Sequence, residues 1–179
     1  MLKQTSTALV IVDVQGKLAQ AMHEKDQLIQ KIKQSIRGAQ ALNLPIVWIE
    51  QYPKGLGPTT PEVAELLTDL SPLEKTTFSA WGNANIVKHI QSLNVNQLVV
   101  CGIESHICVY QSVMDFLANG FHVEVIEDAV SSRTLQNKQM GLNKMHQAGA
   151  QSTCTEMWLF ELLQDAKHPC FRDIQAIIK

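Results

Sequence analysis

Long apolar stretches and clusters of positive charge are both missing from this chain of 179 residues. Its first residues, MLKQTSTALVIVDVQ, reach an aspartate without the apolar run and small-residue cleavage site of a signal peptide. No later stretch is apolar for long enough to span a membrane. The formal net charge is −2, and lysine and arginine are scattered, so the charge pattern of a nucleic-acid binder is absent. We therefore expect a cytoplasmic protein whose partners are neither nucleic acids nor membranes.

Cysteine and histidine are also scarce. The chain has four cysteines, and it is long enough to build a core without disulfides, so we expect reduced thiols. The six histidines show no spacing typical of metal ligands; they are His23, His89, His106, His122, His146 and His168. The sequence therefore predicts neither a metal nor another cofactor.

Hydrophobic residues are abundant, at 45%, and short apolar runs alternate with amphipathic segments over the whole chain. The runs expected to form strands are 8–14, 45–50, 97–102, 122–128 and 151–153, with a strand edge and loop over 71–83. The segments expected to form helices are 24–43, 61–69, 84–94, 106–119, 135–150, the segment that starts at Thr155, and a short last helix; 51–60 is expected to be a loop. This alternation predicts an α/β fold, with helices on both faces of a parallel sheet, in a single domain over residues 1–179.

Polar residues that follow the predicted strands are the first candidates for a functional site. In an open parallel sheet, ligands bind at the carboxyl ends of the strands. The stretch VVCGIESHICVYQSV, residues 99–113, places Cys108 just behind such an end, and Asp13 follows the first strand. If Ser105 is the N-cap of the next helix, Cys108 lies in the first turn, where backbone N–H groups would lower its pKa.

An acid, a lysine and a cysteine in one crevice could catalyse acyl transfer. The thiolate would attack a carbonyl, an amine would leave, and water would hydrolyse the thioester. The residues alone do not distinguish Lys75 from Lys54 as the lysine. Two other functions stay open: a thiol-based sensor of oxidants or electrophiles without a turnover substrate, and an inactive protein that acts through oligomerisation. Cys108 could also be a simple core residue, as Cys101 is expected to be.

Three stretches resemble the isochorismatase-like, or cysteine hydrolase, superfamily. ALVIVDVQ is similar to its first strand, LEKTTFSAW to its lysine segment, and VVCGIESHICVYQSVMDFLANGFHVEVIEDAVSSR to its most specific motif. The C-terminal half resembles the YcaC-like and isochorismatase-domain-containing members. The resemblance implies a three-layer αβα, Rossmann-like fold with six parallel strands, and a homo-oligomer of two or more subunits.

The same resemblance assigns roles to individual residues. It implies a catalytic triad of Asp13, Lys75 and Cys108, and a cis peptide bond between Ile103 and Glu104, with the N–H groups of Glu104 and Cys108 forming an oxyanion hole. True isochorismatases lack the cysteine, and nicotinamidases have a histidine-containing metal site after the second strand, where this chain reads WIEQYPKGLG. We therefore expect a metal-independent, amidase-like hydrolase of a small molecule.

Other polar and aromatic side chains near these strand ends are weaker candidates for substrate binding. They are Gln15, Gln51, Tyr52, Phe78 and His106. His106 lies two residues from Cys108, and residues two apart on a helix point in different directions, so we expect it to orient Glu104 or the turn instead of pairing with the thiol. Arg133 is expected to form a structural ion pair with Asp128.

Overall fold

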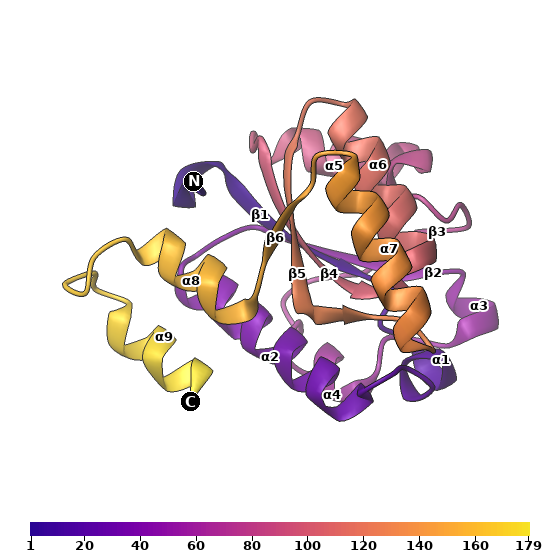
Figure 1. The fold of residues 1–179 in the computed structure, drawn as a ribbon, viewed down its shortest axis with the longest axis horizontal. Helices are drawn as coiled ribbons and strands as arrows, with labels where there is room; N and C mark the ends of the chain where they lie inside the picture. The colour runs from indigo at the N-terminus through magenta and orange to yellow at the C-terminus, as the bar shows by residue number, and fades with distance from the viewer.

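The computed structural model describes residues 1–179, and one parallel sheet of six strands forms its centre (Figure 1). The strand order is β3-β2-β1-β4-β5-β6, and every neighbouring pair is parallel. The strands are β1 (Thr7–Val12), β2 (Ile46–Gln51), β3 (Leu73–Lys75), β4 (Gln97–Ile103), β5 (His122–Ser131) and β6 (Gln151–Thr153). The chain starts in the middle of the sheet and extends it first to one side and then to the other, so the order reverses between β1 and β4.

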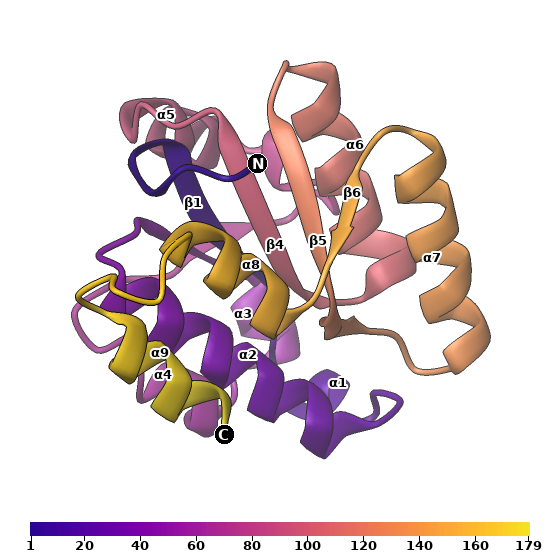
Figure 2. The same ribbon diagram turned by 60° about the vertical axis from the view of Figure 1, so that its left-hand side comes forward.

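Helices cover both faces of the sheet, which makes the three layers predicted from the sequence. The helices are α1 (Gly16–Gln20), α2 (Lys25–Ala41), α3 (Pro53–Leu56), α4 (Pro61–Ala64), α5 (Ala84–Ser92), α6 (Tyr110–Ala118), α7 (Leu135–Gln147), α8 (Thr155–Leu163) and α9 (Phe171–Ile178). Figure 2 shows α2, α8 and α9 together on one face, and α5, α6 and α7 lie on the other.

Alternating side chains of the buried strands supply two separate cores. Leu9 and Ile11 of β1 pack with α2 and α8, whereas Val10 and Val12 pack with α5 and α6. This division follows from the geometry of a strand, in which successive side chains point to opposite faces. All six residues of β1 are buried, as its continuous apolar run predicts.

A glycine allows β1 and β4 to approach closely at the reversal of the strand order. Gly102 has φ +117°, and a Cβ placed on it would lie 2.1 Å from the carbonyl oxygen of Val12. Only glycine fits this combination of backbone angle and contact. This close approach lies at the carboxyl ends of β1 and β4, where the strand order reverses and where ligands of open α/β sheets bind.

Several elements differ from those expected from the sequence. The region 106–119 is a π-helical turn over Ser105–Val109 followed by α6, the predicted loop 51–60 contains α3, and α1 was not predicted. The helix expected at 61–69 ends at Ala64, and the strand expected at 122–128 continues to Ser131. Pro53 and Pro61 each begin a short helix because their fixed φ suits a first helical position, although prolines also mark loops. None of the helices has both the length and the apolar character that crossing a membrane requires.

Candidate functional site

Asp13, Lys75 and Cys108 come together at the carboxyl end of the sheet, although 95 residues separate the first from the last. Asp13 directly follows β1, Lys75 is the last residue of β3, and Cys108 lies in the turn after β4. The parallel strands end at one edge of the sheet, which is why these distant residues converge.

Lys75 is the centre of the polar contacts in this site. Its Nζ donates to Asp13 Oδ2 at 2.7 Å, to Gln51 Oε1 at 2.5 Å and to the carbonyl oxygen of Thr77 at 3.2 Å. The side chain is fully buried, and its three N–H donors match these three acceptors. A buried ammonium is tolerated when it is paired and hydrogen-bonded in this way.

Only one of the two carboxylate oxygens of Asp13 is bonded to Lys75. Oδ1 is buried and has no hydrogen-bond partner. The backbone of Asp13 has φ 52°, a left-handed conformation that aspartate tolerates better than most residues. Burial raises the pKa of Asp13, and the Lys75 ammonium offsets part of that rise. A carboxylate with a raised pKa and a free oxygen is suited to accept a proton.

The thiol of Cys108 is not activated as the sequence analysis expected. Its pKa is raised to about 12, first by burial and second by the charge of Asp13, and Lys75 offsets this rise only in part. Ser105 does not cap a helix, because its hydroxyl has no partner, and the residue before the turn is Glu104. The prediction of a lowered thiol pKa was therefore wrong, since burial outweighs the dipole of a single turn and the nearby ammonium.

The turn that carries Cys108 is held by Glu104 and Arg133. The carbonyl oxygen of Glu104 accepts from Ile107 N at 3.0 Å and Val109 N at 3.2 Å, and the second of these bonds gives the turn its π-helical form. Its carboxylate accepts from Arg133 N and Nε, both at 3.1 Å. The peptide bond between Ile103 and Glu104 is cis, and the N–H of Glu104 donates no hydrogen bond within the chain.

A cavity of about 100 Å³ opens beside Cys108. Three polar residues, Asp13, Gln51 and Glu104, lie along it together with Cys108. The rest of the wall is apolar and consists of Leu18, Leu56, Phe78, Ile103 and Ile107. Phe78 and Leu56 are 55% and 37% exposed, so they form the outer part of the wall.

The candidate substrate-binding residues fall into two groups. Gln51 and Phe78 line the cavity, and Gln51 Oε1 lies 3.9 Å from Cys108 Sγ. Gln15 lies outside it: this side chain is fully buried and its amide is bonded to the backbone of Gln51 and Gly57. Gln15 thus joins β1 to the loop after β2.

Tyr52 and His106 also lie away from the cavity. Tyr52 is 52% exposed and lines a different hollow with Glu74 and Asn83. His106 Nδ1 lies 2.9 Å from Ser132 Oγ, so His106 contacts the residue that follows β5. Arg133, and not His106, holds the side chain of Glu104. The expected pair of Arg133 with Asp128 is wrong, because Asp128 instead accepts from Thr155 N and Oγ1 at the start of α8.

Three apolar wall residues were missed in the sequence analysis. Leu18 lies in α1, Leu56 in α3, and Ile107 precedes the nucleophile candidate. The two helices are only five and four residues long, too short for a periodic pattern. The position of Ile107, next to Cys108 in the motif, was the one usable signal.

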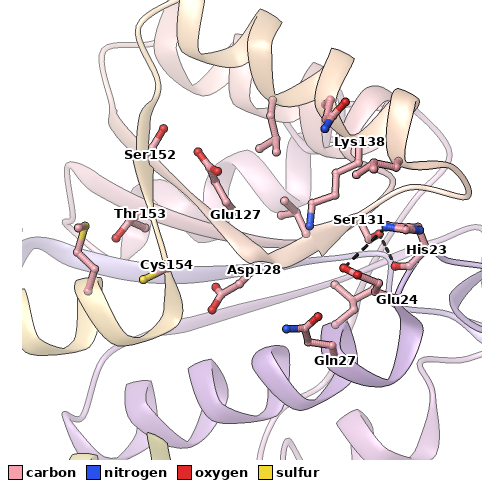
Figure 3. Close-up of a pocket in the computed structure, with 16 residues that line it drawn as sticks. His23, Glu24, Gln27, Glu127, Asp128, Ser131, Lys138, Ser152, Thr153 and Cys154 are labelled. Carbon is pink, nitrogen blue, oxygen red and sulfur yellow. Dashed lines mark hydrogen bonds and ion pairs between the residues drawn. The ribbon is translucent and has the colours of Figure 1, made fainter.

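A larger cavity of about 590 Å³ lies elsewhere, between α7, β6 and the start of α2 (Figure 3). Glu24, Glu127, Asp128 and Lys138 face it, and burial lowers the pKa of Lys138. None of its lining residues lines the cavity at Cys108. Cys154 lines this larger cavity together with Asp128 and Lys138, but no hydrogen bond or ion pair joins these three side chains. Lys75 and Asp13 are bonded at 2.7 Å, so the smaller cavity is the candidate active site. No group of three or more His, Cys, Asp or Glu residues is arranged to hold a metal ion.

Comparison with known proteins shows the family to which the chain belongs. The Isochorismatase domain family profile matches residues 7–157, which is most of the chain. This chain belongs to the isochorismatase family. Among its relatives, Isochorismatase domain-containing protein 2 of Xenopus laevis is 35% identical over 178 residues, covering 99% of this chain and 85% of that protein.

Solved structures of other isochorismatase-like proteins share the fold. A protein described as the MAR1 ribonuclease of Caenorhabditis elegans has a TM-score of 0.92 and 34% identity, over 99% of this chain and 91% of its own. YcaC of Pseudomonas aeruginosa, in a structure with hexane-2,5-diol and covalent acrylamide, has a TM-score of 0.93 and 24% identity, over 99% and 89%. YcaC of Escherichia coli, described as an octameric hydrolase of unknown specificity, has a TM-score of 0.88 and 24% identity, over 98% and 94%.

Proposed function

We propose that this isochorismatase-family protein is a cysteine hydrolase that cleaves the C–N bond of a small amide through a thioester on Cys108. The observation that carries the proposal is that the Cys108 thiol and the Asp13 carboxylate, with its free oxygen, line one cavity, while the buried Lys75 ammonium holds that carboxylate at 2.7 Å from behind the wall. Asp13 is the general base, Lys75 keeps Asp13 ionised and positioned, and Cys108 is the nucleophile. No metal takes part.

The raised pKa of Cys108 determines the order of events in this mechanism. The thiol proton moves to Asp13 Oδ1 as the sulfur attacks the carbonyl carbon, so a free thiolate is not needed beforehand. The N–H groups of Glu104 and Cys108 hold the oxyanion. The C–N bond then breaks, Asp13 returns the proton to the leaving amine, and a thioester remains.

Water completes the cycle at the same residues. Asp13 takes a proton from the water, the hydroxyl oxygen attacks the thioester, and the second tetrahedral intermediate releases the acid. The proton on Asp13 returns to the sulfur, which restores the thiol.

Two alternatives fit the site less well. A thiol sensor of oxidants needs a low-pKa, accessible thiol, whereas burial raises the pKa of Cys108 to about 12 and the residue is 7% exposed. Cleavage of RNA, the activity in the description of the Caenorhabditis elegans relative, would bring phosphates to a cavity whose charged lining residues are both acidic. Both alternatives are outcomes of the experiment below.

We also propose that the protein forms a homo-oligomer in the cytoplasm. The octamer described for Escherichia coli YcaC supports self-association, and the four free cysteines suit a reducing compartment.

The decisive experiment measures ammonia release from a panel of small primary amides by the full chain and by matched variants. We expect Cys108→Ala and Asp13→Asn to lower kcat/KM by about a thousandfold or more while the circular dichroism spectrum is kept. Cys154→Ala is the matched control and keeps full activity. Intact-mass spectrometry during turnover should detect an acyl group that digestion maps to Cys108.

The same panel distinguishes the alternatives. Full activity in Cys108→Ala would refute the nucleophile. Reversible oxidation of Cys108 by peroxide with no hydrolysis of any amide would favour the sensor, and cleavage of a labelled RNA that is lost in Cys108→Ala would favour the ribonuclease.

A further inference from the structure

We propose that the substrate is the primary amide of a short, uncharged, aliphatic acid of two or three carbons. This inference rests on the proposed function and goes further, because it names the acyl group that the cavity accepts. It follows from the volume, the apolar wall and the charges of the cavity at Cys108.

The volume limits the size of the acyl group. The cavity measures about 100 Å³, and an apolar protein cavity of about 150 Å³ is filled by benzene. By that scale, the space beside Cys108 holds about four or five non-hydrogen atoms. Acetamide has four non-hydrogen atoms and propionamide has five, whereas butyramide exceeds this number by one and benzamide and nicotinamide are far larger.

The wall opposite the polar residues selects an aliphatic group. It is made of Leu18, Leu56, Ile103 and Ile107, with Phe78 at the outer part. None of these side chains offers a hydrogen bond to the substrate, so a hydroxyl or a second amide on the acyl chain would be desolvated without a partner. Moving methyl and methylene groups from water onto this wall lowers the free energy of binding.

Charged acyl groups are excluded because no free counter-charge faces the cavity. The ammonium of Lys75 is fully buried and its three donors are used by Asp13, Gln51 and Thr77. The guanidinium of Arg133 is engaged with the Glu104 carboxylate. The only charged groups that line the space are the carboxylates of Asp13 and Glu104, and each already has a cationic partner. Neither an anionic nor a cationic acyl group would therefore find a free counter-charge there.

The limited volume of the cavity also restricts the leaving group to ammonia. Gln51 and Asp13 lie at the polar end beside the sulfur, and Gln51 Oε1 is within 3.9 Å of Cys108 Sγ. An amide NH₂ placed there can donate to these oxygens. A bulky substituent on the nitrogen would need room that about 100 Å³ does not supply once the acyl group is bound.

The first test ranks amides by kcat/KM on the full chain. We expect acetamide and propionamide to be the best substrates, and hexanamide and benzamide to be at least about tenfold worse. Succinamate, the half-amide of a four-carbon diacid, should be at least about a hundredfold worse than butyramide, since its carboxylate finds no partner. Equal rates for butyramide and succinamate, or a preference for benzamide, would overturn the proposal.

A matched pair of variants tests the wall. Phe78 and Leu135 are both exposed apolar residues, at 55% and 42%, but only Phe78 lines this cavity. Phe78→Ala should raise the kcat/KM of benzamide relative to propionamide at least about tenfold, whereas Leu135→Ala leaves the ratio unchanged. An unchanged ratio in Phe78→Ala would show that this side chain does not limit the acyl group.

A second measurement examines the cavity without any turnover. Iodoacetamide and iodoacetate have nearly the same size and differ in charge, and each can alkylate Cys108. The ratio of the iodoacetamide rate to the iodoacetate rate at Cys108, followed by mass spectrometry, should exceed the same ratio for 2-mercaptoethanol at least about tenfold, because the carboxylate of iodoacetate finds no free counter-charge in the cavity.

These results separate failure of the substrate class from failure of the proposed function. If no amide releases ammonia but the alkylation ratio is high, the hydrolase assignment fails while the selection for small neutral groups holds. If amides are hydrolysed without regard to size or charge and the alkylation ratio equals that of 2-mercaptoethanol, the hydrolase assignment holds and the substrate class is wrong.

Discussion

The Cys108 thiol keeps its proton at neutral pH, because burial and the charge of Asp13 both raise its pKa. Burial raises the pKa of Asp13 too, and the Lys75 ammonium at 2.7 Å counteracts part of that effect. The proposed chemistry needs the carboxylate ionised and the thiol protonated before substrate arrives. At the scale of single residues, Lys75 is therefore a positioning group, which keeps the base charged within a buried site.

The pH dependence of hydrolysis tests this view. As the pH falls, Asp13 becomes protonated and kcat/KM decreases. Because the pKa of Asp13 is raised, this decrease should be centred at a pH above about 3.9, the ordinary pKa of an aspartate. On the alkaline side, kcat/KM should stay level at pH 8–9, with no thiolate absorbance near 240 nm, since the pKa of Cys108 is about 12.

Lys75→Met removes the ammonium that lowers the pKa of Asp13, so the acid limb of the profile should move to higher pH. The circular dichroism spectrum is the control for folding. A thiolate signal at pH 7 in the unmodified protein, or an acid limb that does not move in Lys75→Met, would contradict the proposed roles.

The turn over Ser105–Val109 owes its position to contacts with a neighbouring helix. Gly141 of α7 lies against it so closely that a Cβ would be 2.5 Å from the carbonyl oxygen of Ser105 and 2.8 Å from His106 N. These are backbone atoms, which cannot rotate away. At the scale of elements, the position of Cys108 is thus set by the packing of α7 on the turn.

Gly141→Ala tests this packing. We expect a loss of stability of about 1–3 kcal/mol from overpacking and a fall in kcat of about tenfold or more, since the sulfur shifts relative to Asp13. Asn143→Ala, at an exposed position of the same helix, is the matched control and should keep both the unfolding midpoint and kcat. Thermal unfolding and ammonia release measure the two effects, and unchanged kcat in Gly141→Ala would show that the turn tolerates the displacement.

Self-association is the prediction at the scale of the whole molecule. The chain has a mass of 20.0 kDa and a net charge of −2, which gives little electrostatic repulsion between copies. We expect light scattering after size-exclusion chromatography to give a multiple of this mass, unchanged in Cys108→Ala. A single mass of one chain at micromolar concentration would rule out the proposed oligomer.

The fold and its order of layers could be predicted from local patterns. The run at 8–14 is apolar throughout because β1 is buried on both faces, and the amphipathic spacing over 24–43 reflects a helix with one face on the core. The candidate residues Asp13 and Cys108 followed from the rule that polar groups after parallel strands share one edge. Lys75 came from the resemblance to a family, because nothing local separates it from Lys54.

The sequence by itself determined the alternation of strands and helices, the parallel sheet and the residues that end its strands, because hydrophobic periodicity and chain connectivity are local properties. Tertiary structure alone decided the state of the thiol, the partner of Arg133 and the wall of the cavity. Each of these depends on which distant atoms exclude water from a given group. Burial of that kind is a property of packing, and it raised the pKa of Cys108 where its place in a helical turn had predicted the opposite.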